Sequence, residues 1–110
     1  MIVDRQENTT LITQECVEFN KFVNRFSEAY SKYKKDNIIL NLMALTDLKA
    51  NDLMEFHEIV VEHLGNSKSF VIVTDSVNYN DVNGDLVVVP TLKEAYDLIE
   101  MEEIERDLDA

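Results

Sequence analysis

Two histidines on one predicted helix are the part of this sequence that comes closest to a catalytic motif. The segment HEIVVEH, residues 57–63, differs from the zinc-protease pattern His-Glu-x-x-His in the position of its second histidine. Histidines four apart on a helix are separated by about 40° and can share a metal, whereas six positions separate them by about 240°. We therefore expect no zinc site here. We expect His57 to border the apolar side of the helix and His63 to lie at its end, where a protonated ring would favour the helix dipole.

The loop Ser76–Asp85 is a candidate for binding a cation. Its oxygen-bearing side chains, counted with the residue before it, are Asp75, Asn78, Asn80, Asp81, Asn83 and Asp85. A calcium-binding loop needs a Gly at its sixth position and a Glu at its twelfth, and neither follows Asp81 at that spacing. We interpret the segment as a solvated loop rich in turns, with a weak Mg²⁺ or Ca²⁺ contact as the alternative.

The single cysteine, Cys16, excludes an intramolecular disulfide and fits a reducing compartment. Glu15 and Glu18 lie beside it and disfavour the reactive thiolate, so we predict a structural thiol. The sequence contains no Gly-rich phosphate loop and no Ser-His-Asp arrangement. We therefore predict a protein that is not an enzyme, with no catalytic, cofactor-binding or metal-binding residues and no cofactor.

The elements that must position these residues alternate between strands and helices. Short β-branched segments at Met1–Asp4 and Thr9–Gln14 predict a strand pair. Helical spacing of apolar residues predicts three helices: Cys16–Tyr33, Asn51–Leu64 and a last one from Thr91 to the chain end. Continuous apolar runs predict strands covered on both faces: Ile38–Leu45, Phe70–Thr74 and Leu86–Val89. The alternation predicts an α/β fold with parallel crossovers and a mixed sheet of four to five strands.

Two signals mark the ends of the predicted helices. Gly65 follows the second helix, and we expect it to cap that helix in the left-handed conformation. Thr91 and Glu94 form a capping box before the third helix. In this box the Thr91 hydroxyl accepts the Glu94 amide proton, and the Glu94 carboxylate reaches back to the Thr91 amide.

Composition limits the class of partner. The chain has 110 residues, of which 45% are apolar, enough for one domain with a core. Its net charge of −12 argues against nucleic acid and anionic membranes, because both require clustered cations. The N-terminal residues do not resemble a secretion signal, and no apolar run reaches the length of a membrane span. We expect a cytoplasmic protein.

The segment NIILNLMALTDL, residues 37–48, together with the order of elements, resembles the STAS domain, the fold of bacterial anti-anti-sigma factors. The resemblance covers most of the chain. It implies one STAS-like domain over residues 1–110, with an acidic C-terminal helix extension over residues 99–110. In that family an Asp-Ser-Ser/Thr-Gly loop follows the central strand, and a switch kinase phosphorylates one of its hydroxyls. The matching positions here are Lys49, Ala50, Asn51 and Asp52, and Asn51, at the phosphoacceptor position, has no hydroxyl.

This resemblance implies a non-catalytic STAS-like domain for protein interaction or regulation, without the hydroxyl switch. The sequence also resembles short proteins of Bacteroidetes-type bacteria that carry a ribonuclease Z label, most specifically over residues 86–108. That label implies tRNA 3′ processing by a di-zinc enzyme, which needs a His-x-His-x-Asp-His cluster and further histidines, and this chain has two. The second hypothesis is therefore an accessory protein connected with ribonuclease Z, not itself the nuclease.

The C-terminal segment offers a surface for a protein partner. Met101, Ile104 and Leu108 carry an apolar pattern past the length that a helix needs to cross a small sheet, among many carboxylates. The helix either packs on its own domain or overhangs and docks on another subunit or a partner. The partner-binding candidates are Lys49, Asn51, Asp52, Met101, Ile104 and Leu108. We expect a protein partner, with a homodimer as one form, and neither nucleic acid nor membrane.

Overall fold

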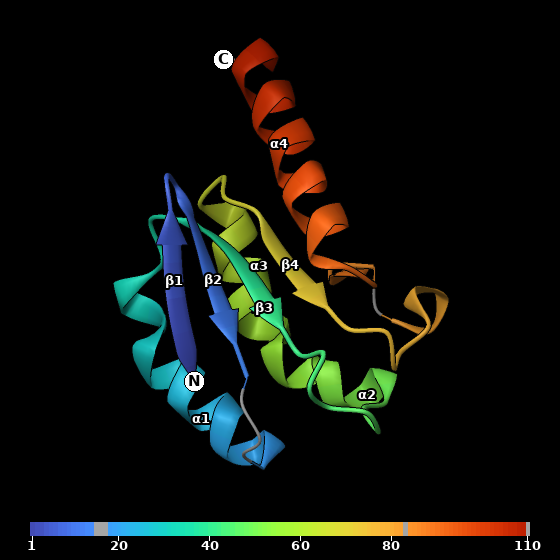
Figure 1. Cartoon of the computed structure of the whole chain (residues 1–110). Coiled ribbons are helices and arrows are strands. Elements are labelled where there is room, and N and C mark those ends of the chain that lie inside the picture. Colours follow the sequence, from blue (N-terminus) through green and yellow to red (C-terminus); the bar gives the residue numbers. More distant parts are fainter. Residues whose placement is uncertain (15–17, 83, 110) are drawn as a thin grey trace.

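The computed structural model describes residues 1–14, 18–82 and 84–109, which form one mixed sheet flanked by helices (Figure 1). The strands are β1 (Ile2–Gln6), β2 (Thr9–Thr13), β3 (Asn37–Asn41), β4 (Phe70–Val73) and β5 (Val87–Val89). The α-helices of this part of the chain are α1 (Phe19–Ala29), α2 (Ala50–Leu53), α3 (His57–Gly65) and α4 (Leu92–Asp109). Single 3₁₀ turns lie at Tyr30–Lys32, Met54–Phe56 and Tyr79–Asp81. The predicted α/β class with a mixed sheet is confirmed.

The order of the strands decides which face of the sheet each helix covers. The strands lie side by side in chain order, with β1 antiparallel to β2 and all later pairs parallel. Because parallel crossovers are right-handed, a sheet that grows in one direction places its crossovers on one face. Helices α1, α2 and α3 share that face, and α4, which follows the last strand, lies on the other (Figure 1). We call these the crossover face and the α4 face.

Aromatic rings form the core on the crossover face. The ring of Phe26 lies 5.9 Å from those of both Phe56 and Phe70, edge to face. Phe22, one turn earlier on α1, is also fully buried, as its helical spacing predicts. Burying each of these side chains contributes roughly 1.5–3 kcal/mol. This layer therefore ties α1 and the 3₁₀ turn before α3 to the middle of the sheet.

A smaller core lies on the α4 face. Ile39, Val71 and Val73 of the central strands pack against Ala95 and Ile99 of α4, and all five are buried. Strands β3 and β4 are thus covered on both faces, which explains why they read as continuous apolar runs. The single chain covers both faces of these strands, so they give no reason to expect a second subunit there.

The strand that we predicted over Ile38–Leu45 is shorter in the structure, where β3 ends at Asn41. The Asn41 side chain causes this early end, since its Oδ1 accepts the amide proton of Met43 at 3.1 Å. A turn follows, with the Leu45 amide donating to the Leu42 carbonyl at 3.0 Å. Asn side chains that bond the backbone two residues on turn the chain in this way.

The predicted helix Asn51–Leu64 consists of α2, a 3₁₀ turn and α3. Gly65 is not a left-handed cap, and this prediction is wrong. It is the last residue of α3, and the positive φ of this turn, 62°, is found at Ser67. The Asn66 and Ser67 amides donate to the His63 and Leu64 carbonyls, at 3.1 and 3.0 Å, respectively. The left-handed residue that ends the helical turn thus lies two positions later than we expected. For the helix predicted over Cys16–Tyr33, Cys16 lies outside the described residues, and α1 begins at Phe19.

Helix α4 begins with the predicted capping box. The Glu94 amide donates to Thr91 Oγ1 at 3.2 Å, and the Thr91 hydroxyl lies 3.2 Å from Glu94 Oε2. The carboxylate thus returns to the hydroxyl of Thr91, where we had expected it to reach the amide. Across the described ranges, no helix has both the length and the apolar character to cross a membrane.

Candidate functional site

The two histidines of the segment HEIVVEH lie in different environments. His57 is half-buried, with Nε2 3.0 Å from Asp85 Oδ2 at the loop before β5. His63 is fully buried and contacts Tyr30 and the backbone of Asp36. The separation predicted from their spacing is confirmed. In the described part of the chain, no group of three or more His, Cys, Asp or Glu is placed to hold a metal ion.

The hydrogen bonds of His63 assign its proton. The Asp36 carbonyl oxygen, 2.8 Å from Nε2, can only accept, so Nε2 carries the hydrogen. Nδ1 then accepts from the Tyr30 hydroxyl at 2.7 Å. Burial lowers the pKa of His63 and raises that of Tyr30 to about 12, so the neutral imidazole and the protonated phenol are both favoured. His63 lies in the last turn of α3, as we expected, but its ring is buried in the core, where the neutral form is favoured, so it is not the protonated partner of the helix dipole that we considered.

The Asp36 side chain extends this contact to the edge of the sheet. Its carboxylate accepts from Arg5 Nε at 2.8 Å and Nη2 at 3.0 Å, and from the buried Thr10 hydroxyl at 2.9 Å. The hydrogen bond from Arg5 holds the pKa of Asp36 below its usual range. We call Arg5, Thr10, Tyr30, Asp36 and His63 the polar chain. Tyr30 and His63 are enclosed and Arg5 forms the exposed end, so this chain of contacts joins β1, β2, α3 and the segment before β3.

The Lys49–Asp52 segment, which we compared with the STAS phosphorylation loop, forms the start of α2. The Asp52 carboxylate accepts the backbone N–H of Lys49 at 2.9 Å, so Asp52 is the capping side chain. Asn51 is exposed on the first turn. Asn51 is not the N-cap of this helix, because the helix starts one residue before our predicted start, at Ala50.

The loop before β5 is rich in turns, as we interpreted it, but it is not fully solvated, because Val77 and Val82 pack against the core of the crossover face. Asn78 Oδ1 accepts the Asn80 amide proton at 2.9 Å, and the Asn78 carbonyl accepts that of Asp81 at 2.9 Å. Asp85 points to His57 instead of joining the other carboxylates. Asn83, which we counted among the cation candidates, lies outside the described residues.

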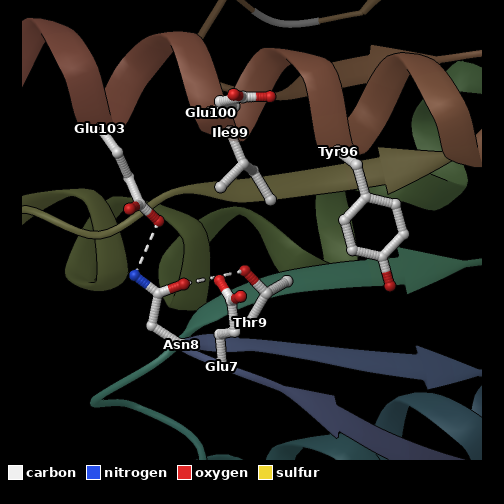
Figure 2. A pocket seen from close by; sticks show the side chains of 7 residues that line it. All are labelled: Glu7, Asn8, Thr9, Tyr96, Ile99, Glu100 and Glu103. Carbon is white, nitrogen blue, oxygen red and sulfur yellow. Dashed lines mark hydrogen bonds between the residues drawn. The ribbon is translucent and has the colours of Figure 1, made fainter.

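An acidic cleft of about 350 Å³ lies between α4 and the β1–β2 hairpin (Figure 2). Its lining is Glu7, Asn8, Thr9, Tyr96, Ile99, Glu100 and Glu103. Figure 2 shows the Glu103 side chain reaching from α4 to Asn8, whose Nδ2 donates to Glu103 Oε1 at 2.9 Å. Sequence reasoning missed this cleft because its two walls are separated by almost the whole chain.

Polar contacts hold the C-terminal half of α4 to the sheet. Asn37 Nδ2 also donates to Glu103 Oε1, at 2.5 Å, and Asn37 Oδ1 accepts the Ser69 amide proton at 2.9 Å. The Ser69 hydroxyl donates to Glu102 and accepts from Arg106. These contacts fasten the helix at the start of β3 and β4, where its last turns project past the strands (Figure 1). We call Asn37, Ser69, Glu102, Glu103 and Arg106 the polar anchor.

The predicted partner-binding side chains of α4 lie on its opposite side. Met101, Ile104 and Leu108 are 59%, 54% and 80% exposed. Met101 and the buried Ile99 are about 160° apart around the helix, so the exposed residues form a second stripe and do not continue the buried one. The inner side of α4 therefore packs on its own domain, as the first alternative expected, and the outer side is exposed.

A groove of about 390 Å³ continues this stripe toward β5. It is lined by Val88, Val89, Pro90, Glu94, Asp97, Leu98 and Met101. Met101 belongs to both features. We call the combined apolar set the outer α4 surface: Val88, Val89, Pro90, Leu98, Met101, Ile104 and Leu108. Sequence reasoning missed Leu98, although its position three residues before Met101 was a usable signal.

Neither a scan against protein-family models nor a search of curated proteins finds a match for this chain. The resemblances to the STAS domain and to the ribonuclease Z-labelled proteins stay predictions.

Proposed function

We propose that this protein is a non-catalytic, STAS-like interaction domain that binds a protein partner through the outer α4 surface. The exposed stripe of Met101, Ile104 and Leu108 carries the proposal. These side chains add nothing to the core of their own domain, and a row of exposed apolar residues rimmed by polar ones is typical of a protein-binding site. Burial of such anchors is the main source of affinity in protein interfaces.

Other features support a non-catalytic role. The polar chain holds its Tyr and His where a substrate has no access, and the loop that matches the STAS switch has Asn51 at the hydroxyl position. The net charge of −12 disfavours nucleic acid and anionic lipid as partners. A cytoplasmic location is part of the same proposal, on the basis of charge and the lone cysteine.

Affinity capture from the native host, followed by reconstitution with the purified partner, tests the proposal. The stripe variant carries Met101→Ser, Ile104→Ser and Leu108→Ser. A matched control carries Met54→Ser, Val61→Ser and Leu64→Ser, which removes exposed apolar side chains from the opposite side of the molecule. We expect wild type and control to bind one partner equally, and the stripe variant to lose it.

All three proteins should unfold at similar denaturant concentrations, because the changed residues are exposed. Equal binding by the stripe variant, or substrate turnover by the purified protein, contradicts the proposal. The identity of the partner separates our two hypotheses: a regulatory protein fits the STAS-like one, and a complete di-zinc nuclease fits the accessory one.

A further inference from the structure

We propose that the segment bound by the outer α4 surface is a basic amphipathic helix of the partner. This inference rests on the proposed function, and it adds the chemistry of the occupant. Three observations support it: the shape of the surface, the charges around it and the shortness of the neighbouring sheet edge.

The outer α4 surface has the shape of one side of a helix pair. Leu98, Met101, Ile104 and Leu108 follow each other at intervals of three and four residues, over a length of about 15 Å. A second helix packs on such a row by placing its own apolar residues, at the same spacing, between them. Next to Met101, the groove at Val88 and Pro90 has room for a large apolar side chain of that helix.

The free edge of β5 is a weaker template for a partner strand. β5 has three residues, and Pro90, which has no amide hydrogen to donate, follows it directly. Strand addition depends on a run of backbone hydrogen bonds, which this edge is too short to supply. The surface therefore favours a helix.

The charges beside the stripe favour a basic occupant. Glu94, Asp97 and Glu105 are exposed and project on the same side of α4 as Met101. The cations of this helix are engaged: Lys93 Nζ lies 3.2 Å from Asp97, and Arg106 turns inward to Ser69 and Glu102. Lys or Arg beside the apolar seam of the partner would meet these carboxylates. A second copy of this chain would instead bring carboxylates against carboxylates, and the two molecules, each with a net charge of −12, would repel each other.

Synthetic helical peptides of about 18 residues, a length that spans the surface with a turn to spare at each end, test the inference directly. The first peptide has Leu at the seam positions and Lys at the flanking ones. The second has the same composition in scrambled order, and the third has Glu in place of Lys. We expect the first to bind at least about tenfold more tightly than the scrambled one, the third not to bind, and added salt to weaken binding. Amide NMR shifts of the labelled protein should change at residues 98–108 and at β5.

Charge variants separate the flanking carboxylates from overall charge. Asp97→Asn with Glu105→Gln should weaken binding of the first peptide and reduce its salt dependence. Glu28→Gln with Glu58→Gln removes the same charge from exposed positions on α1 and α3 and should have little effect. The stripe variant should lose the preference for the first peptide over the scrambled one.

Several results would overturn the inference. Equal affinity for the scrambled peptide would mean that the peptides are attracted by net charge alone. NMR shift changes centred on the acidic cleft of Figure 2 would mean that the basic peptide binds there and not at the outer α4 surface. A dimer in light scattering that the stripe variant abolishes would make a second copy the occupant. If host capture depends on the stripe but the bound partner segment is not a basic helix, this inference fails and the proposed function stands. If neither capture nor peptide binding depends on the stripe, both fail.

Discussion

The Tyr30 hydroxyl donates a hydrogen bond to Nδ1 of His63 across 2.7 Å, and both side chains are buried. The rings meet edge to face, with their centroids 5.5 Å apart. The other ring nitrogen of His63, Nε2, donates a hydrogen bond to the Asp36 carbonyl. Both ring nitrogens therefore have partners in the neutral tautomer with its hydrogen on Nε2, and a second proton, on Nδ1, would require the Tyr30 hydroxyl to turn its hydrogen away from the ring and accept instead.

Stability should fall as the pH is lowered through the range in which a free histidine titrates. Burial lowers the pKa of His63 below 6.5, so the unfolded chain takes up this proton at a higher pH than the folded one. The stability from the neutral ring is thus complete above about pH 6.5 and is lost below it. Urea unfolding between about pH 8 and pH 5.5 measures the loss. Lys68 and Arg106 oppose protonation and Glu62 favours it, so burial decides the direction.

His63→Gln and His57→Gln provide the comparison for this pH dependence. The first variant should start less stable and lose most of the dependence, because it has no ring to protonate. The second should retain the dependence, because it keeps the buried His63 ring. An unaltered slope in His63→Gln would show that another group is responsible.

Asp36→Ala should destabilise the fold by about 1–3 kcal/mol, because it leaves the buried Thr10 hydroxyl without its acceptor. The Arg5 side chain is 62% exposed, so we assign little of this loss to the ion pair itself. The carboxylate has a lowered pKa, so its contribution is present above pH 3.8 and is lost as the pH falls toward the folded-state value. Denaturant unfolding measures the change, and Asp47→Ala, on an exposed turn, should have almost no effect.

Asp52→Ala should destabilise by about 0.5–1 kcal/mol, because the Lys49 amide at the start of α2 loses its acceptor. Asn51→Ala should leave stability nearly unchanged, since this side chain is exposed on the helix. Paired unfolding curves of the two variants decide the point. A larger loss of stability in Asn51→Ala than in Asp52→Ala would show that Asn51 is the capping residue.

Truncation after Glu100 should lower stability by about 1–3 kcal/mol, although the large apolar side chains that it removes, Met101, Ile104 and Leu108, are all exposed. The truncation deletes Glu102, Glu103 and Arg106, and so leaves the buried Asn37 and Ser69 with fewer partners. The stripe variant, which keeps the polar anchor, should unfold like wild type. Hydrogen exchange should show faster opening of α4 in Ser69→Ala and not in the stripe variant. Equal stability of the truncated and full chains would show that the polar anchor does not stabilise the fold.

Local pattern was enough to predict the class of fold. Helical spacing on α1, the apolar runs of β3 and β4 and the Thr91–Glu94 box are properties of neighbouring residues, and each element was found in its predicted place. Element ends were less well predicted. The Asn41 side chain ended a strand that hydrophobicity alone would continue to Leu45, and α3 extended through Gly65 before the chain turned at Ser67.

Tertiary structure decided what the individual polar and apolar side chains do. His63 has the spacing of a helix-end residue, but its partners lie 27 and 33 residues away in the chain, at Asp36 and Tyr30, and these contacts hold it in the core. On α4, both the Ile99 side and the Met101 side carry apolar residues, and the sequence does not tell which side faces inward. Packing of Ala95 and Ile99 on the sheet, together with the contacts of Glu102, Glu103 and Arg106 with Ser69 and Asn37, fixes the rotation of the helix. This rotation, which depends on partners from distant strands, leaves Met101, Ile104 and Leu108 exposed.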